Sequence, residues 1–215
     1  MKFLRRSIWL LTGIIITVPL IVFGVVHWYQ DKFEKLPVLG GYDVSEKGIP
    51  IQHTISPFEF ENQDGKIFSS DNEKNKIIIA NFFFTSCAGI CPNMMNHVKQ
   101  VQGFFLQDPN IHFISFTVDP KRDNAPRLKW YADQYNIKTD NWDLLTGKKN
   151  EIYKLARKSF YLSANEGDGG ENDFIHSEQL VLLDKNKHIR GYYNGTDDNS
   201  MEQLKHDIKK LEHEN

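Results

Sequence analysis

The sequence predicts an α/β domain, in which a central β-sheet is flanked by helices, preceded by an N-terminal transmembrane helix. Three observations predict this: an uncharged apolar run near the N-terminus, an almost wholly apolar strand in the middle of the chain, and alternating strands and amphipathic helices after it. A chain of 215 residues is long enough for one compact domain with appendages. We divide it into residues 1–30, the cytoplasmic N-terminus and membrane anchor, residues 31–50, a linker, and residues 51–215, the folded domain.

Composition and charge exclude several classes of protein. Hydrophobic residues make up 40% and charged residues 25% of the chain, a balance typical of a globular body rather than a disordered protein. The net charge of −2 provides no cationic field for phosphate groups, so we expect no nucleic-acid partner. Two cysteines can form at most one disulfide, too few for a small domain whose fold is stabilised by several disulfides. The function of this pair therefore has to be inferred from its reactivity and its position in the chain.

The N-terminal run from Ile8 to Val26 contains no charged residue and approaches the length of about 20 residues that a membrane-spanning helix needs. Basic residues precede it at Lys2, Arg5 and Arg6, so the positive-inside rule places the N-terminus in the cytoplasm and the rest of the chain outside. A cleaved signal peptide is the alternative. The run is longer than a usual signal-peptide core and no small-x-small cleavage site follows it, which favours an uncleaved anchor.

The folded domain is expected to begin near Ile51, after the proline- and glycine-containing linker. Alternation at Phe58 and Phe60, followed by Gln63-Asp64-Gly65 and residues 66–69, indicates a short hairpin. The run from Ile77 to Phe84 consists almost entirely of β-branched and aromatic residues. This pattern is typical of a central strand covered on both faces.

Helices and strands alternate in the second half of the chain. Pro92 opens a helix whose apolar face carries Met94, Val98, Val101 and Phe105. Strands are predicted over His112–Val118, Trp142–Thr146, Gln179–Leu183 and His188–Tyr193. Amphipathic helices are predicted from the apolar residues of Leu128–Tyr135, Ile152–Ala156 and Met201–Leu211. Ser200 and Gln203 are expected to form a capping box at the start of the last helix. This order is that of a thioredoxin-like fold, with its reactive loop at the carboxyl end of a central strand.

Cys87 and Cys91 lie at the junction between the central strand and the helix that follows it. If they form one helical turn, both sulfurs lie on the same side, where they can bind one metal ion or close a redox disulfide. The helix N-terminus favours the thiolate that either chemistry requires. A purely structural disulfide would close too short a loop to contribute much stability, and a structural zinc site usually needs four ligands.

His176 is the best candidate for a third ligand among the eight histidines. It lies just before the strand Gln179–Leu183, where a thioredoxin-like loop faces the cysteines, and after a glycine- and acid-rich stretch, residues 165–173, that is expected to be mobile. Two thiolates with an imidazole suit copper, particularly Cu(I). His97 and His112 remain alternative ligands. Met94 and Met95 are expected to pack in the core rather than to bind metal. The other histidines are expected on the solvated surface: His27, His53, His188, His206 and His213.

Three segments together resemble the Sco/SenC family of copper-binding assembly factors for cytochrome c oxidase. They are Phe84-Thr85-Ser86-Cys87-Ala88-Gly89-Ile90-Cys91-Pro92, Ser115-Phe116-Thr117-Val118-Asp119-Pro120-Lys121-Arg122-Asp123 and Phe174-Ile175-His176-Ser177. The resemblance covers about residues 55–212. It implies that Cys87, Cys91 and His176 are the copper ligands, and that Asp119 lies near the site, in its second shell or as a loop cap. The sequence departs from the family pattern at Ala88-Gly89 and at Ile175.

The resemblance implies a membrane-anchored copper metallochaperone rather than an enzyme. It would carry Cu(I) or Cu(II) to the cytochrome c oxidase subunit that bears the CuA centre, or reduce that subunit's cysteines. The orientation of the anchor places the domain outside the cytoplasm, and the absence of an Arg- and Ser-rich transit peptide favours the periplasm beside a bacterial inner membrane over mitochondria. The alternative is a thiol-disulfide oxidoreductase that acts through Cys87 and Cys91 on partner-protein cysteines, for which His176 would be dispensable. A peroxidase is a third interpretation, but its single reactive cysteine needs no partner four residues away.

Overall fold

The computed structural model describes residues 13–26, 29, 35–45, 47–162 and 177–214. The chain forms two compact units, Met1–Lys35 and Leu36–Asn215. In the first unit, residues 13–26 are helical and their apolar side chains are exposed. No helix in the described part of the chain is long and apolar enough to cross a membrane. The transmembrane helix predicted over Ile8–Val26 is therefore not found there, and its residues 8–12 lie outside the described ranges.

The second unit is built on a seven-stranded mixed sheet with the strand order β4-β3-β7-β6-β5-β8-β9. Strand β5 pairs in parallel with β6 on one side and antiparallel with β8 on the other, which confirms the predicted central strand. The strands are β3 (Glu59–Asn62), β4 (Ile67–Ser69), β5 (Ile77–Phe83), β6 (Ile111–Thr117), β7 (Trp142–Thr146), β8 (Gln179–Leu183) and β9 (Ile189–Asn194).

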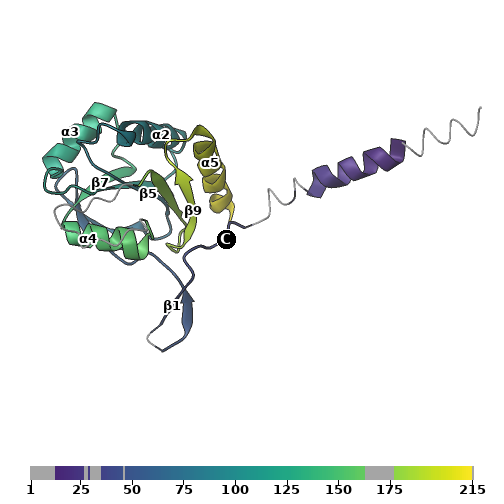
Figure 1. Cartoon of the computed structure of the whole chain (residues 1–215), viewed down its shortest axis with the longest axis horizontal. Coiled ribbons are helices and arrows are strands. Elements are labelled where there is room, and N and C mark those ends of the chain that lie inside the picture. The colour runs from purple at the N-terminus through teal and green to yellow at the C-terminus, as the bar shows by residue number, and fades with distance from the viewer. Residues whose placement is uncertain (1–12, 27–28, 30–34, 46, 163–176, 215) are drawn as a thin grey trace, which may run out of the picture. The chain divides into compact units, whose positions relative to one another are not determined.

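Helices cover both faces of this sheet, as Figure 1 shows. Helices α2 (Ile90–Phe104), α3 (Ala125–Tyr135) and α5 (Asp198–His213) pack on one face, while α4 (Lys149–Lys154) and the π-helical turn Leu155–Ser159 pack on the other. Successive residues of β5 face opposite cores: Ile77 and Ile79 join the first core, Ile78 and Ala80 the second. A strand buried on both faces is apolar at nearly every position, which explains the run that predicted it.

The folded unit begins earlier than the predicted boundary near Ile51, because part of the predicted linker, residues 31–50, packs on the domain. Leu39 forms a β-bridge with Ile189, and a hairpin follows, β1 (Tyr42–Val44) and β2 (Pro50–Gln52). Arg190 binds this segment, since its guanidinium donates to the carbonyl oxygens of Leu36 and Pro37. A buried arginine gives no apolar periodicity, so the sequence pattern did not reveal this attachment.

Two further predictions about local structure are wrong. Helix α5 begins at Asp198, and its cap is Asp197, whose carboxylate accepts the Ser200 N–H at 2.8 Å, so Ser200 and Gln203 form no capping box. His53, expected on the solvated surface, is only 4% exposed. Its Nδ1 lies 2.8 Å from Asp43 Oδ2 and its Nε2 lies 2.8 Å from the Ser159 carbonyl oxygen, and these partners make its burial possible.

We predict that Arg190→Ala lowers the free energy of unfolding by about 3 kcal/mol, because it leaves the largely buried carboxylates of Asp184 and Glu214 without their cation. Urea denaturation measures this change. Lys148→Ala is the matched control, since it breaks an exposed pair with Glu151 and should cost less than about 0.5 kcal/mol. Equal losses in the two variants would show that Arg190 does not hold the N-terminal segment in this way.

Candidate metal and redox site

The two cysteines lie in the connection between β5 and α2. This helix begins at Ile90, so Cys91 lies in its first turn and Cys87 lies in the loop before it. The single helical turn considered for the pair is therefore not formed. The loop still brings the two thiols into hydrogen-bonding contact, and both are free, with Cys87 half-buried and Cys91 4% exposed. The site thus presents a dithiol at the N-terminus of a helix.

A buried carboxylate, Asp123, fixes the loop that carries Cys87. Its Oδ2 accepts the Thr85 N–H at 2.9 Å and its Oδ1 accepts the Thr85 hydroxyl at 2.6 Å. The Thr117 hydroxyl, at the end of β6, donates to the same carboxylate at 2.6 Å. Asp123 therefore ties the cysteine loop to the end of the neighbouring strand. No sequence pattern assigned it this role, and the only signal was an acidic residue just before Asn124, the N-cap of α3.

The environment gives the two thiols different acidities. Burial raises the pKa of Cys87, but hydrogen bonds from the Cys91 thiol and from the backbone N–H groups at the start of α2 outweigh it and hold the pKa below that of an ordinary thiol. Burial and the hydrogen bond to Cys87 raise the pKa of Cys91 to about 12. Cys87 is thus the more acidic thiol of the pair, and Cys91 the less acidic one.

His176 lies outside the described residues, so the structure does not place the predicted third ligand. The strand that follows it, β8, runs antiparallel to β5 and pairs Leu180 with Asn81. Strand β8 therefore starts at the carboxyl end of β5, the end that leads to the cysteines. Within the described ranges, no group of three His, Cys, Asp or Glu side chains could hold a metal ion.

Comparison with known proteins identifies the family. A sequence model of the SCO1/SenC family matches residues 47–213. The chain belongs to the SCO1/SenC family. It is 34% identical over 172 residues to the SCO1 protein homolog of Bacillus subtilis (strain 168), a match that covers 79% of this chain and 87% of that protein.

Solved structures of Sco proteins share the fold. BsSco, described as a member of the Sco family of cytochrome c oxidase assembly proteins with a disulfide switch, is 32% identical with a TM-score of 0.65, over 77% of this chain and 98% of that one. Arabidopsis thaliana ScoI, solved with copper bound, has a TM-score of 0.59 at 22% identity, over 74% of this chain and 98% of that one. The predicted thioredoxin-like α/β fold is confirmed by this likeness.

A tyrosine of α3, Tyr131, also lies at the dithiol site of this Sco/SenC protein. Tyr131 is buried beside both sulfurs, and its pKa is raised, first by burial, then by Tyr135 and by the charge of the two cysteines. The Tyr135 ring stacks on it with a centroid distance of 4.4 Å. The sequence placed both tyrosines in the apolar stripe of a helix. The structure adds that Tyr131 of this stripe lies beside the two cysteines.

The alternative histidine ligands are engaged elsewhere. His97 Nδ1 lies 2.9 Å from the Gly195 carbonyl oxygen and its Nε2 lies 3.2 Å from Asp198 Oδ1. His112 is buried with Nε2 2.9 Å from Asp143 Oδ2. Neither forms a described metal-binding group with the cysteines.

The methionines after Cys91 are packing residues, as predicted. Met94 and Met95 are fully buried in the core beneath α2. The Asn81 amide donates to Met95 Sδ at 3.6 Å, so this thioether already has a polar partner. Neither side chain is therefore presented to an ion at the surface.

Asp119 forms the turn between β6 and α3. Its N–H donates to Thr117 Oγ1, its carbonyl oxygen accepts from the N–H groups of Arg122 and Asp123, and its carboxylate lies 3.7 Å from Arg122 Nη1. These are the contacts of a loop cap. A second-shell role for Asp119 beside a bound metal stays a prediction.

We predict that the alkylation of Cys87 by iodoacetamide has a pH midpoint below about 8.5, the value of an ordinary thiol, while Cys91 stays unmodified up to neutral pH. The sign follows from the lowered pKa of Cys87, which enlarges its thiolate fraction at neutral pH. Peptide mapping by mass spectrometry of the reduced, folded protein measures both sites. Cys91→Ala removes the S–H donor and should raise the midpoint of Cys87; an unchanged midpoint would contradict the assigned hydrogen bond.

A second prediction concerns the clamp on the cysteine loop. Asp123→Ala should lower the free energy of unfolding by about 3 kcal/mol, because the Thr85 N–H and the Thr117 hydroxyl lose their buried acceptor. Asp140→Ala, at an exposed position, is the control and should cost less than about 0.5 kcal/mol. Chemical denaturation compares the two variants, and a loss at Asp123 no larger than the control value would refute the clamp.

Proposed function

We propose that this Sco/SenC protein is a membrane-anchored copper metallochaperone that binds copper through Cys87, Cys91 and His176 and assists assembly of the CuA centre of cytochrome c oxidase. One observation carries the proposal: two free thiols in contact at a helix N-terminus, one of them with a lowered pKa. Copper is the cargo of this site. The protein need not turn over a substrate.

The donor set favours copper over other metals. Soft thiolate ligands select Cu(I), and an added imidazole is compatible with either oxidation state of copper. Two cysteines with one histidine fall short of the four protein ligands usual in a structural zinc site. The family supports the same metal, since copper is bound in the Arabidopsis ScoI structure and BsSco is described as a cytochrome c oxidase assembly protein.

His176 is proposed as the third ligand because of its place in the chain. It is separated from the first residue of β8, Gln179, by only two residues, and β8 starts at the end of β5 that leads to the cysteines. Among the described residues, no His, Asp or Glu side chain completes a three-residue metal group with Cys87 and Cys91. His176 is the residue of suitable chemistry closest in sequence to that strand end.

The thiols also couple metal binding to protons and to redox state. Copper has to displace the proton of Cys91, whose pKa is about 12, so binding releases protons and weakens as the pH falls. If the dithiol is oxidised to a disulfide, two electrons leave and both sulfurs are lost as thiolate ligands. The reduced protein is therefore the form that loads copper.

We propose in addition that the run Ile8–Val26 anchors the protein in a bacterial inner membrane, with the domain in the periplasm. The lack of charge in this run and the basic residues Lys2, Arg5 and Arg6 before it support this orientation. The partner would then be the oxidase subunit that bears the CuA centre.

Copper titration of the reduced full chain tests the ligand set. We predict one copper per wild-type chain and an affinity lowered by about 100-fold or more in Cys87→Ser, Cys91→Ser and His176→Ala, since each removes one ligand. His206→Ala, on the half-exposed face of α5, is the control and should keep the wild-type affinity. Wild-type affinity and stoichiometry in all three ligand variants would defeat the assignment.

A second candidate function is thiol-disulfide exchange on partner cysteines. The opposite pKa shifts favour it, because a more acidic thiol at Cys87 beside a less acidic thiol at Cys91 suits an attacking and a resolving thiol. His176→Ala separates the two functions. A variant that loses copper but supports oxidase assembly would favour exchange, and one that loses both would favour the chaperone.

A further inference from the structure

The β1–β2 hairpin is not held to the domain by the packing of its own apolar side chains. Four of these side chains are exposed: Tyr42 by 73%, Val44 by 75%, Ile49 by 57% and Ile51 by 49%. Among the described residues, none of the four belongs to either buried core. Figure 1 shows the hairpin projecting away from the sheet. Its position on the domain therefore depends on polar contacts.

His53, directly after β2, makes these polar contacts. Its Nε2 lies 2.8 Å from the carbonyl oxygen of Ser159, the last residue of the π-helical turn. Its Nδ1 lies 2.8 Å from Asp43 Oδ2 on β1 and 3.1 Å from the hydroxyl oxygen of Tyr161. The imidazole ring therefore joins the hairpin to the end of the π-helical turn.

The two ring nitrogens differ in what their partners allow. A carbonyl oxygen can only accept, so Nε2 carries a proton and donates it to Ser159. Nδ1 faces the carboxylate of Asp43, which can only accept, and the hydroxyl of Tyr161, which can also donate. A protonated ring therefore binds Asp43 through Nδ1. A neutral ring has a lone pair at Nδ1, which repels the carboxylate and accepts from Tyr161.

The surroundings of His53 favour this exchange of partners. The residue is 4% exposed, so Nδ1 depends on protein groups for its hydrogen bond. The Asp43 side chain is 49% exposed and is hydrated once it leaves the ring. Burial and the charge of Asp43 raise the pKa of Tyr161, so its hydroxyl keeps its proton at neutral pH. Among the described residues, Asp43 and Tyr161 are thus the titratable groups that face the ring, while Tyr192 of β9 lies near Tyr161 and donates its hydroxyl to the Phe160 carbonyl oxygen.

Close packing keeps the imidazole in place during the exchange. The rings of His53 and Tyr161 lie with their centroids 4.5 Å apart. Gly40, at a φ of +95°, lies against both rings, since a Cβ there would be 3.0 Å from His53 Cδ2 and 3.1 Å from Tyr161 Cε2. The ring therefore has little room to turn, and the proton on Nδ1 decides which partner is bound.

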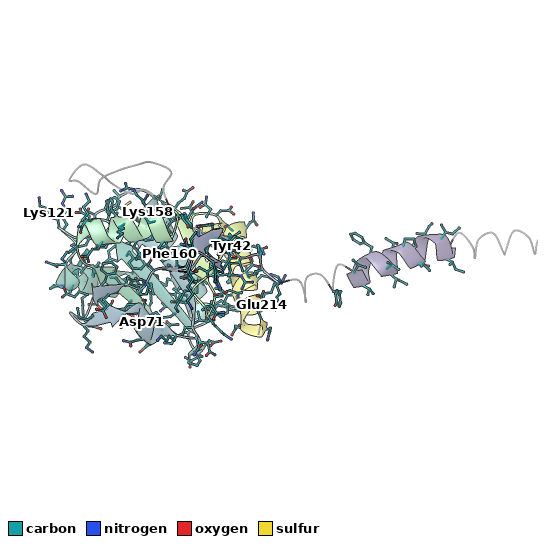
Figure 2. The ribbon with its side chains drawn as sticks, turned by 90° about the horizontal axis from the view of Figure 1, so that it is seen from below. Tyr42, Asp71, Lys121, Lys158, Phe160 and Glu214 are labelled. Atoms are coloured by element: carbon teal, nitrogen blue, oxygen red, sulfur yellow. The ribbon has the colours of Figure 1, made fainter. Side chains whose placement is uncertain are left out.

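We propose that His53 is a proton-operated latch for the β1–β2 hairpin. The imidazolium binds Asp43 and holds the hairpin at the end of the π-helical turn, whereas the neutral ring accepts from Tyr161 and releases Asp43 together with the hairpin. Figure 2 labels Tyr42 on the hairpin and Phe160 beside the turn, the two segments that the latch joins. A two-stranded hairpin alone is only marginally stable in water, so the released hairpin loses its cross-strand hydrogen bonds. The attachment therefore weakens as the pH rises, and copper takes no part in it.

Hydrogen–deuterium exchange of the reduced full chain in detergent, at about pH 5.5 and about pH 8.0, tests the latch. These values lie on either side of about 6.5, where an ordinary imidazole titrates, and above about 4, where an ordinary carboxyl titrates. After correction for the intrinsic pH dependence of exchange, peptides covering residues 42–52 should exchange about tenfold faster at the higher pH, because one charge-assisted hydrogen bond is lost. Peptides from β5 are the internal reference and should keep the same protection at both values.

Three variants separate the latch from a general effect of pH. Asp43→Asn should abolish the tenfold difference, because an amide can accept from the protonated ring and donate to the neutral one. Tyr161→Phe removes the donor to the neutral ring, so release of the hairpin should require a higher pH. Asp198→Asn is the matched control and should keep the wild-type difference. Asp198 Oδ1 lies 3.2 Å from His97 Nε2, away from the hairpin, and the Asp198 side chain is 91% exposed.

A difference that is confined to residues 42–52, abolished in Asp43→Asn and kept in Asp198→Asn would support the latch. Equal corrected exchange at both pH values in the wild type would overturn it, as would a difference that persists in Asp43→Asn. Equal acceleration in the β5 peptides would also overturn it, because the whole domain would then loosen. None of these measurements involves copper, so failure of the latch leaves the proposed function unaffected.

Discussion

The contact between the sulfurs of Cys87 and Cys91 depends on the hydrogen bonds of Asp123. The loop after β5 has no regular structure of its own, and Thr85 is attached to Asp123 through both its backbone N–H and its hydroxyl. This attachment places Cys87 before the N-terminus of α2, where backbone N–H groups face its sulfur. The lowered pKa of Cys87, which favours metal binding as well as sulfur exchange, follows from that position.

The sheet supplies the rigidity that this loop requires. Strand β5 is hydrogen-bonded on both sides and buried on both faces, so the point at which the chain leaves it is fixed. The same carboxylate reaches Thr117 at the end of β6, and α3 places Tyr131 against the sulfurs. Three neighbouring elements therefore hold the dithiol, while the remaining ligand is proposed to come from the segment before β8. Two fixed sulfurs and a third ligand on a separate segment, as proposed, would suit the release of a bound metal.

The sequence predicted the parts of the fold that depend on periodic apolar burial. The eight-residue run at Ile77 and the stripe from Met94 each correspond to an element buried as expected. Polar contacts between distant segments were not predictable: Arg190 attaches residues near Leu36, and Asp123 clamps Thr85, without any pattern at those positions. At the site, the cysteine pair was predicted from its motif, and the missed residues were those whose role depends on tertiary contact, such as Tyr131. The role of His176 as a metal ligand stays a prediction. It is based on the family resemblance and on the position of the first residue of β8 at the carboxyl end of β5.

The most direct test of the account is X-ray absorption spectroscopy of the copper-loaded protein at the copper edge. The account predicts a first shell of two sulfurs and one nitrogen, with the outer-shell scattering of an imidazole, and predicts that His176→Ala abolishes the imidazole signal while both sulfurs remain. A shell without two sulfurs, or an imidazole signal that persists in His176→Ala, would contradict it.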